Sequence, residues 1–118
     1  MSTFSVTIQV GDLQGQRYES LEALVDTGSS HLVVPRPMLE RLGVSVEERL
    51  PFELADKRIV EYDVGQVRVR IDGRERFTTV VFGGPGTDSL LGSSTLELFN
   101  LGVDPVRRRL ISLPGLLM

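Results

Sequence analysis

Apolar and polar residues alternate in the first quarter of the chain in a way that predicts two paired strands. Apolar side chains occupy every second position from Phe4 to Val10, which is the period of a strand with one buried face. A turn-forming stretch follows at residues 11–16, and residues 18–25 have the composition of a returning strand. We therefore expect a β-hairpin whose second strand delivers Asp26 at its C-terminal end.

Three further elements are predicted before the middle of the chain. Residues 31–34 indicate a short apolar strand, and residues 37–42 indicate one or two helical turns capped by Gly43. Residues 52–62 place the polar sequence Ala-Asp-Lys-Arg between two extended segments. We expect a hairpin there whose tip, residues 55–58, projects into water.

The pattern then predicts a second hairpin. Residues 64–71 alternate between apolar and charged side chains, and Asp72-Gly73 is a favoured two-residue hairpin turn. Residues 77–82 indicate the returning strand, and residues 83–87 indicate a flexible loop.

A helix and one strand are expected near the C-terminus. Residues 93–99 indicate a helix with Ser93 or Ser94 as its N-cap, which residues 100–102 end. Residues 110–113 indicate a last strand. Many short strands with one or two short helices predict a mostly β fold.

Composition agrees with an ordinary globular protein. The chain has 118 residues, of which 41% are hydrophobic and 25% charged, so we expect one domain over residues 1–118. No apolar run approaches the roughly 20 residues of a membrane helix, so no membrane partner is expected. The sequence MSTFSVTIQV lacks a basic start followed by a long apolar segment, which predicts a cytoplasmic location.

Charge and residue usage exclude several kinds of function. The net charge of -3 comes from 13 basic and 16 acidic residues scattered along the chain, so we expect no nucleic-acid partner. The run Arg107–Arg109 indicates a solvated turn, with a basic binding patch as the alternative. Cysteine is absent and His31 is the single histidine, which excludes thiol nucleophiles and multi-histidine metal sites. We expect neither a metal nor a cofactor.

Asp26 lies between two apolar runs in the sequence ALVDTGSSHLVVP, residues 23–35. An ionised carboxylate is costly in apolar surroundings, so it must be hydrogen-bonded, partly neutralised or kept because chemistry needs it. Asp-Thr-Gly also occurs in ordinary turns, because Asp bonds its own backbone and Gly permits a positive φ. The tripeptide alone leaves both interpretations open.

The surroundings of the tripeptide carry a resemblance. Apolar residues precede it, Ser29 and Ser30 follow it, and Leu90-Leu91-Gly92 stands before a helix, a turn and a strand in LLGSSTLELFNLGVDPVRRRLISL. Over nearly the whole chain this arrangement resembles the retropepsin-like aspartic proteases. The resemblance implies a closed β-barrel of the acid-protease fold, with one lobe per chain and a hairpin flap at residues 52–62.

The resemblance also implies a role for each residue of the loop. Asp26 would be catalytic, Thr27 would hydrogen-bond across a dimer to brace two loops, and Gly28 would let the backbone approach the substrate. A pepsin-like chain carries two such loops, and this chain carries one. The chemistry uses two carboxylates that share a proton, so we expect a homodimer with Asp26 of each subunit on the two-fold axis. The expected function is an aspartic endopeptidase that acts on a peptide or protein substrate.

Substrate contacts are expected from the loop, the flap tip and the downstream apolar pair. These residues are Ser29, Ser30, His31, Ala55, Asp56, Leu90 and Leu91. For His31 the alternative is an ordinary surface histidine. Because related dimers interleave their termini, the resemblance implies that the apolar end, Leu116 to Met118, joins the N-terminal strand in a sheet between subunits, with a disordered tail as the alternative.

Two features depart from the retroviral pattern. The flap tip is charged rather than glycine-rich, and Ser30 and Ser93 stand where retroviral enzymes usually have an acidic residue and an arginine. Losing both partners together avoids a buried unpaired charge, so the fold need not suffer. These departures keep open a second function, that of a non-catalytic peptide-binding or dimerisation module.

Overall fold

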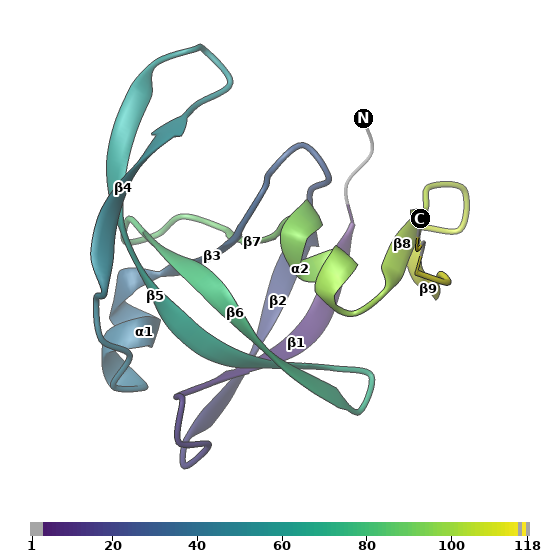
Figure 1. The fold of residues 1–118 in the computed structure, drawn as a ribbon, viewed down its shortest axis with the longest axis horizontal. Coiled ribbons are helices and arrows are strands. Elements are labelled where there is room, and N and C mark those ends of the chain that lie inside the picture. Colours follow the sequence, from purple (N-terminus) through teal and green to yellow (C-terminus); the bar gives the residue numbers. More distant parts are fainter. Residues whose placement is uncertain (1–3, 116, 118) are drawn as a thin grey trace.

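The fold is a closed β-barrel with short helices and an appended hairpin, as the computed structural model of residues 4–115 and 117 shows (Figure 1). In chain order the elements are β1 (Ser5–Gly11), β2 (Tyr18–Val25), β3 (Leu32–Pro35), α1 (Arg36–Arg41), β4 (Glu48–Glu53), β5 (Ile59–Ile71), β6 (Arg74–Gly83), β7 (Ser89–Leu91), α2 (Ser93–Leu98), β8 (Leu101–Asp104) and β9 (Arg109–Ser112). Seven strands form one sheet in the order β1-β2-β7-β3-β6-β5-β4, and a pairing of β1 with β5 closes it. The predicted mostly β fold is confirmed.

The N-terminal hairpin forms as predicted, because its alternating side chains fill one side of the barrel interior. β1 and β2 are antiparallel in a register that begins at Ser5↔Leu24. Ile8 and Val10 are buried in the core, whereas Ser5 and Thr7 before them are exposed. β2 has the bounds that the sequence predicted.

β5 is one continuous strand, where the sequence predicted two segments separated near Asp63. Its second half pairs with β6 from Val64↔Val81 onward and belongs to the barrel wall. Its first half pairs only with β4, and this hairpin, the flap (residues 48–63), stands clear of the barrel (Figure 1). The two halves form one strand because the pairing with β4 continues to Val64, where the pairing with β6 begins.

The turn between β5 and β6 confirms the prediction from Asp72-Gly73. Both residues have a positive φ, 49° at Asp72 and 78° at Gly73, as the favoured hairpin turn requires. β6 begins directly after it at Arg74, earlier than predicted, because the hairpin ladder starts at Ile71↔Arg74.

The helices follow the prediction except at the start of α2. Gly43 after α1 has a φ of 76°, as a glycine at a helix end requires. The predicted N-cap, Ser93 or Ser94, is wrong: the N-cap is Gly92, and no side chain caps the helix. The Ser94 hydroxyl instead donates to the carbonyl of Ser30, 2.5 Å away, in a loop distant in sequence.

The C-terminal part contains one strand that the sequence did not predict. Residues 100–102, expected only to end the helix, continue into β8, which pairs with β9 as a separate two-stranded sheet. The Asp104 carboxylate accepts hydrogen bonds from the N–H groups of Val106 and Arg107 and so shapes the turn. The predicted solvated turn at Arg107–Arg109 is confirmed, since these side chains are exposed.

Some predictions on the chain ends fall outside what the structure describes. Leu116 and Met118 lie outside the described residues, and Leu117 is fully exposed. Among the described residues no helix is long and apolar enough to cross a membrane. The cytoplasmic location and the extent of the single domain stay predictions.

The barrel interior is filled by side chains from all of its walls. The largest fully buried apolar residues are Phe99, Ile8, Leu32, Leu39, Leu91, Val10, Val34, Val67, Val69 and Val80. Thr78 and Thr95 are buried beside one another, with their hydroxyl oxygens 3.4 Å apart. In the described residues every buried side-chain nitrogen and oxygen has a hydrogen-bond partner. The described residues therefore form an apolar core in which the buried polar side chains are hydrogen-bonded.

Glu75 on β6 joins three neighbouring side chains on the outer wall of the barrel. Arg68 donates to its carboxylate at 2.7 Å, Arg70 at 2.6 Å and the Tyr18 hydroxyl at 2.9 Å. These hydrogen bonds, from Arg68 first, lower the pKa of Glu75 from its ordinary 4.5 to about 2. A carboxylate whose pKa is depressed by folding stabilises the folded state above its unfolded pKa and loses that contribution as the pH falls.

We expect Glu75→Gln to lower the melting temperature near neutral pH, because Arg68 and Arg70 then lose their anionic partner. The difference from the wild type should shrink as the pH falls from about 4.5 towards 2, where the wild-type carboxylate also becomes protonated. Melting curves across this range test it, with Glu97→Gln on the exposed side of α2 as the control. A difference that does not change with pH would contradict this assignment.

Candidate active site

Asp26 stands at the first residue of the loop that follows β2. Its N–H donates to the carbonyl of Leu91 on β7 at 3.1 Å, and its carbonyl accepts from the N–H of Ser29 at 3.1 Å. One carboxylate oxygen accepts from the N–H of Gly28 at 3.0 Å, and the residue is half-buried. The carboxylate is therefore hydrogen-bonded within its own turn while part of it stays accessible.

The start of α2 holds the same loop from the other side. The N–H groups of Ser93 and Ser94 donate to the carbonyls of Ser29 and Ser30 at 2.8 and 3.0 Å. Main-chain hydrogen bonds thus connect the loop to α2 at the positions where the retroviral pattern has an acidic residue and an arginine. The Ser30 hydroxyl lies 2.7 Å from Nδ1 of His31, so this side chain is engaged within the loop.

Gly92 allows the loop and β7 to approach each other closely. A Cβ atom at Gly92 would lie 2.6 Å from the carbonyl oxygen of His31, 2.7 Å from its nitrogen and 2.7 Å from the carbonyl oxygen of Ser29. All three are backbone atoms; the Ser29 oxygen accepts the N–H of Ser93, and the His31 oxygen accepts the hydroxyl of Ser29. The Gly of the Leu-Leu-Gly motif is therefore required by packing.

We expect Gly92→Ala to destabilise the fold by about 3 kcal/mol, because backbone must move to admit the methyl group. Urea unfolding measures this directly. Gly84→Ala is the matched control, since its Cβ would meet only a methyl group of Thr87 at 3.6 Å and should cost no more than about 0.5 kcal/mol. Equal unfolding midpoints for the two variants would contradict the packing argument.

A groove of about 470 Å³ lies between the flap and the loop. Its size is in the range of ligand-binding clefts. Its lining combines residues of the loop, β3, the flap and β6–β7: Gly28, Ser29, Ser30, His31, Val33, Phe52, Glu53, Leu54, Tyr62, Val81, Gly83, Gly84, Thr87, Asp88 and Leu90. Apolar and aromatic side chains dominate it, and none of its lining residues is Lys or Arg.

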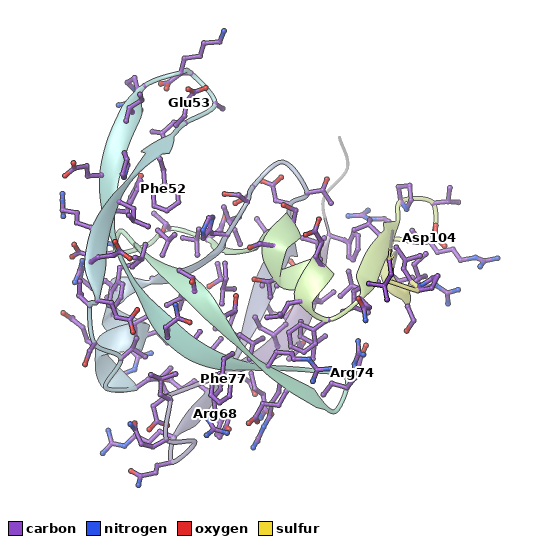
Figure 2. The ribbon with its side chains drawn as sticks, viewed as in Figure 1. Phe52, Glu53, Arg68, Arg74, Phe77 and Asp104 are labelled. Carbon is purple, nitrogen blue, oxygen red and sulfur yellow. The ribbon has the colours of Figure 1, made fainter. Side chains whose placement is uncertain are left out.

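Aromatic rings connect the loop to the flap across this groove. The rings of His31 and Phe52 meet edge to face, with centroids 5.2 Å apart, and Phe52 meets Tyr62 in the same manner at 6.0 Å. Figure 2 shows Phe52 and Glu53 on the flap, where β4 approaches its tip. The flap is therefore in side-chain contact with the residue that ends the Asp26 loop.

The predicted site residues separate into those that line the groove and those that do not. Gly28, Ser29, Ser30, His31 and Leu90 line it, and Asp26 and Thr27 precede them in the same loop. Leu91 is fully buried in the barrel core. Ala55 and Asp56 are exposed at the flap tip outside the groove, where the Asp56 carboxylate binds Arg58.

The prediction missed the inner face of the flap. Phe52, Leu54 and Tyr62 line the groove, although only the tip residues were expected to do so. The alternation of Leu50, Phe52 and Leu54 with exposed residues was a signal for this face. The wall from Val81 to Asp88 gave no comparable signal, because its glycine-rich part indicates only a loop.

Among residues 4–115 and 117, no group of three or more His, Cys, Asp or Glu side chains is placed to hold a metal ion. The groups that the site offers are therefore carboxylates, hydroxyls, one imidazole and backbone atoms.

A closed β-barrel with one Asp-Thr-Gly loop and a hairpin over the adjoining groove defines the class of retropepsin-like aspartic proteases. Residues 6–95 match the aspartyl protease family, and the chain belongs to this family. The resemblance seen in the sequence is thereby confirmed.

Solved structures with the same fold include viral and bacterial proteins. The EIAV protease in complex with the inhibitor HBY-793 has a TM-score of 0.56 and 18% identity, over 81% of this chain and 86% of that chain. A retropepsin-like aspartic protease from Rickettsia conorii has a TM-score of 0.54 and 23% identity, over 87% and 88%. The simian foamy virus (mac) protease has a TM-score of 0.54 and 18% identity, over 78% and 92%. A search of curated proteins found no match.

Proposed function

We propose that this protein is a homodimeric aspartic endopeptidase in which Asp26 of each subunit supplies one of two catalytic carboxylates. The observation that carries the proposal is the half-buried Asp26, fixed in its turn by Gly28, in a loop whose following residues line an apolar groove under the flap. Membership of the aspartyl protease family supports the reaction class.

The proposed reaction needs both carboxylates and one shared proton. The ionised carboxylate accepts a proton from water, whose oxygen attacks the peptide carbonyl carbon, while the protonated carboxyl donates to the carbonyl oxygen. The resulting tetrahedral diol then breaks its C–N bond as a proton passes to the leaving nitrogen. Thr27 would brace the two loops across the dimer, and Gly28 would let the substrate backbone approach them.

The proposed dimer contact involves the C-terminal sheet. β8 and β9 form a two-stranded sheet apart from the barrel, on the side of α2 (Figure 1), and an isolated two-stranded sheet is marginal in water. Leu98, at the end of α2, and Leu113, which follows β9, are partly exposed, by 42% and 47%. A second copy packed on this face would cover these apolar side chains and stabilise the sheet.

The proposed substrate is an extended peptide with a large apolar side chain near the cleaved bond. Ser29, Ser30, His31 and Leu90 would contact it from the barrel side, and the aromatic residues Phe52 and Tyr62 from the flap. The flap tip, Ala55 and Asp56, would reach the substrate only when the flap closes, and Leu91 would act by packing beneath the loop.

Cleavage of a peptide library between about pH 4 and pH 8 tests this proposal. We expect cleavage next to apolar residues, inhibition by a statine-type transition-state mimic, and a loss of activity at the pH where both carboxylates become ionised. Absence of cleavage throughout this range, in protein shown to be dimeric, would contradict the enzyme assignment.

The second candidate is a non-catalytic peptide-binding or dimerisation module. The ion pair between Asp56 and Arg58 at the flap tip favours it, because a solvated charged tip is a poor cover for an apolar substrate. This module would bind library peptides without cleaving them, so binding with intact peptides recovered would favour it over the protease.

A further inference from the structure

The flap leaves the barrel at a single point on β5. Val64↔Val81 is the last pair between β5 and β6, and residues 59–63 beyond it pair only with β4. Just below this point Gly65 lies against the chain that enters β4, since a Cβ atom there would lie 2.4 Å from the carbonyl oxygen of Ser45. The strand is therefore closely packed at Gly65 and becomes one arm of a two-stranded hairpin at Asp63.

Asp63 at this junction binds two guanidinium groups from different elements. One carboxylate oxygen is bonded to Arg36, the first residue of α1, and the other accepts from Arg49 of β4 at 3.2 Å. The Asp63 side chain is only 20% exposed, and the hydrogen bond from Arg36 is the main cause that lowers its pKa. The ionised carboxylate thus connects α1 to both strands of the flap.

Arg36 is itself fixed to the barrel wall. Its guanidinium carbon lies 4.8 Å from the centroid of the Phe82 ring, which is buried on β6. Stacking of a guanidinium on an aromatic face restricts where its N–H groups can point. The Asp63 carboxylate therefore binds a donor that does not move with the flap.

Asp63 is connected to the groove through its neighbour on β5, Tyr62. Adjacent residues of a strand point to opposite faces, so Asp63 faces the outer side while Tyr62 lines the groove. Tyr62 contacts Phe52, which contacts His31 of the Asp26 loop. A rotation of the flap at Asp63 would displace this aromatic wall.

We infer that Asp63 is a positioning residue: by binding Arg36 and Arg49 it sets the angle of the flap over the groove. The effect on peptide cleavage rests on the proposed function, whereas the effect on flap mobility does not. Asp63, Arg36 and Arg49 together form the clamp, and it acts on the groove through Tyr62 and Phe52.

The test compares Asp63→Asn with Glu61→Gln, two changes that each remove one negative charge from β5. Glu61 also bonds Arg49, at 3.3 Å, but its side chain is 60% exposed and it does not reach α1. Hydrogen–deuterium exchange is followed in the flap and, as an internal reference, in the buried part of β6. We expect Asp63→Asn to speed exchange in the flap about tenfold with β6 unchanged, and Glu61→Gln to leave both within about twofold.

A further variant, Arg36→Gln, tests whether the bond between Asp63 and Arg36 of α1 limits flap mobility. We expect it to speed flap exchange as much as Asp63→Asn does, and the double variant to be no faster than either single variant. With an apolar peptide substrate, both single variants should raise KM about fivefold while kcat changes less than about twofold.

Three results would overturn the inference. The first is a flap exchange rate in Asp63→Asn equal to that in Glu61→Gln. The second is an exchange rate in Asp63→Asn that rises as much in β6 as in the flap. The third is a flap exchange rate in Arg36→Gln equal to that of the wild type. If the wild type cleaves no peptide, the proposed function fails, yet the exchange measurements still decide whether the clamp exists.

Discussion

Replacing Asp26 with asparagine is expected to abolish peptide hydrolysis and leave the fold intact. An amide can neither accept the proton of water nor deliver one to the carbonyl, and such proton transfer contributes about 10²–10⁴-fold to the rate. The asparagine side-chain oxygen can still accept the hydrogen bond from Gly28, which is the contact that orders the carboxylate in its turn. The measurement is kcat/KM on the best library peptide, with melting temperature as the check on folding.

Asp12→Asn is the matched control for this change. The Asp12 carboxylate also accepts backbone N–H groups in a loop, those of Gln16 at 2.9 Å and Arg17 at 2.8 Å. That loop joins β1 to β2 at the end of the barrel far from the flap (Figure 1). We expect near-normal kcat/KM for Asp12→Asn, and activity retained in Asp26→Asn would exclude Asp26 as a catalytic group.

Mixing active and inactive subunits is expected to show that each site needs two copies of Asp26. If subunits exchange freely, equal amounts of wild type and Asp26→Asn at constant total protein should give about a quarter of the wild-type activity, because only wild-type pairs have both carboxylates. A site formed within one chain would instead give about half under the same random mixing. Activity measured after incubation to exchange equilibrium separates the two outcomes.

Subunits that carry Asp12→Asn provide the comparison for the mixing experiment. They keep Asp26, so mixtures with wild type should stay close to full activity at every ratio. Sedimentation of the same mixtures reports whether dimers form at all, and a monomer with full activity at every concentration would refute the shared site.

The elements that the sequence predicted well are those in which local chemistry and burial agree. The alternation from Phe4 to Val10 and the turn at Asp72-Gly73 each demand one local structure, and both formed as expected. The Asp26 loop was singled out from its surroundings, the flanking apolar runs and the downstream Leu-Leu-Gly sequence, because the tripeptide alone also fits an ordinary turn.

The features that escaped prediction depend on contacts between distant segments. β5 looked like two strands because Asp63 interrupts its apolar pattern, and only the ion pair with Arg36 shows why a charge belongs there. Serine is a common N-cap residue, but the Ser94 hydroxyl donates to the carbonyl of Ser30 instead. Phe52 had the correct alternation for an inward face, yet nothing local indicated that His31 would be its neighbour.

The hydrogen bonds that hold the Asp26 loop have a consequence for how the protein is made. The loop is fixed by Leu91, Ser93 and Ser94, and the contact between Ser30 and Ser94 joins residues 64 positions apart. Pairing across such a separation forms late, because a long segment of chain must be ordered first. A growing polypeptide would therefore carry its Asp-Thr-Gly turn without these long-range hydrogen bonds until β7 and α2 have been synthesised.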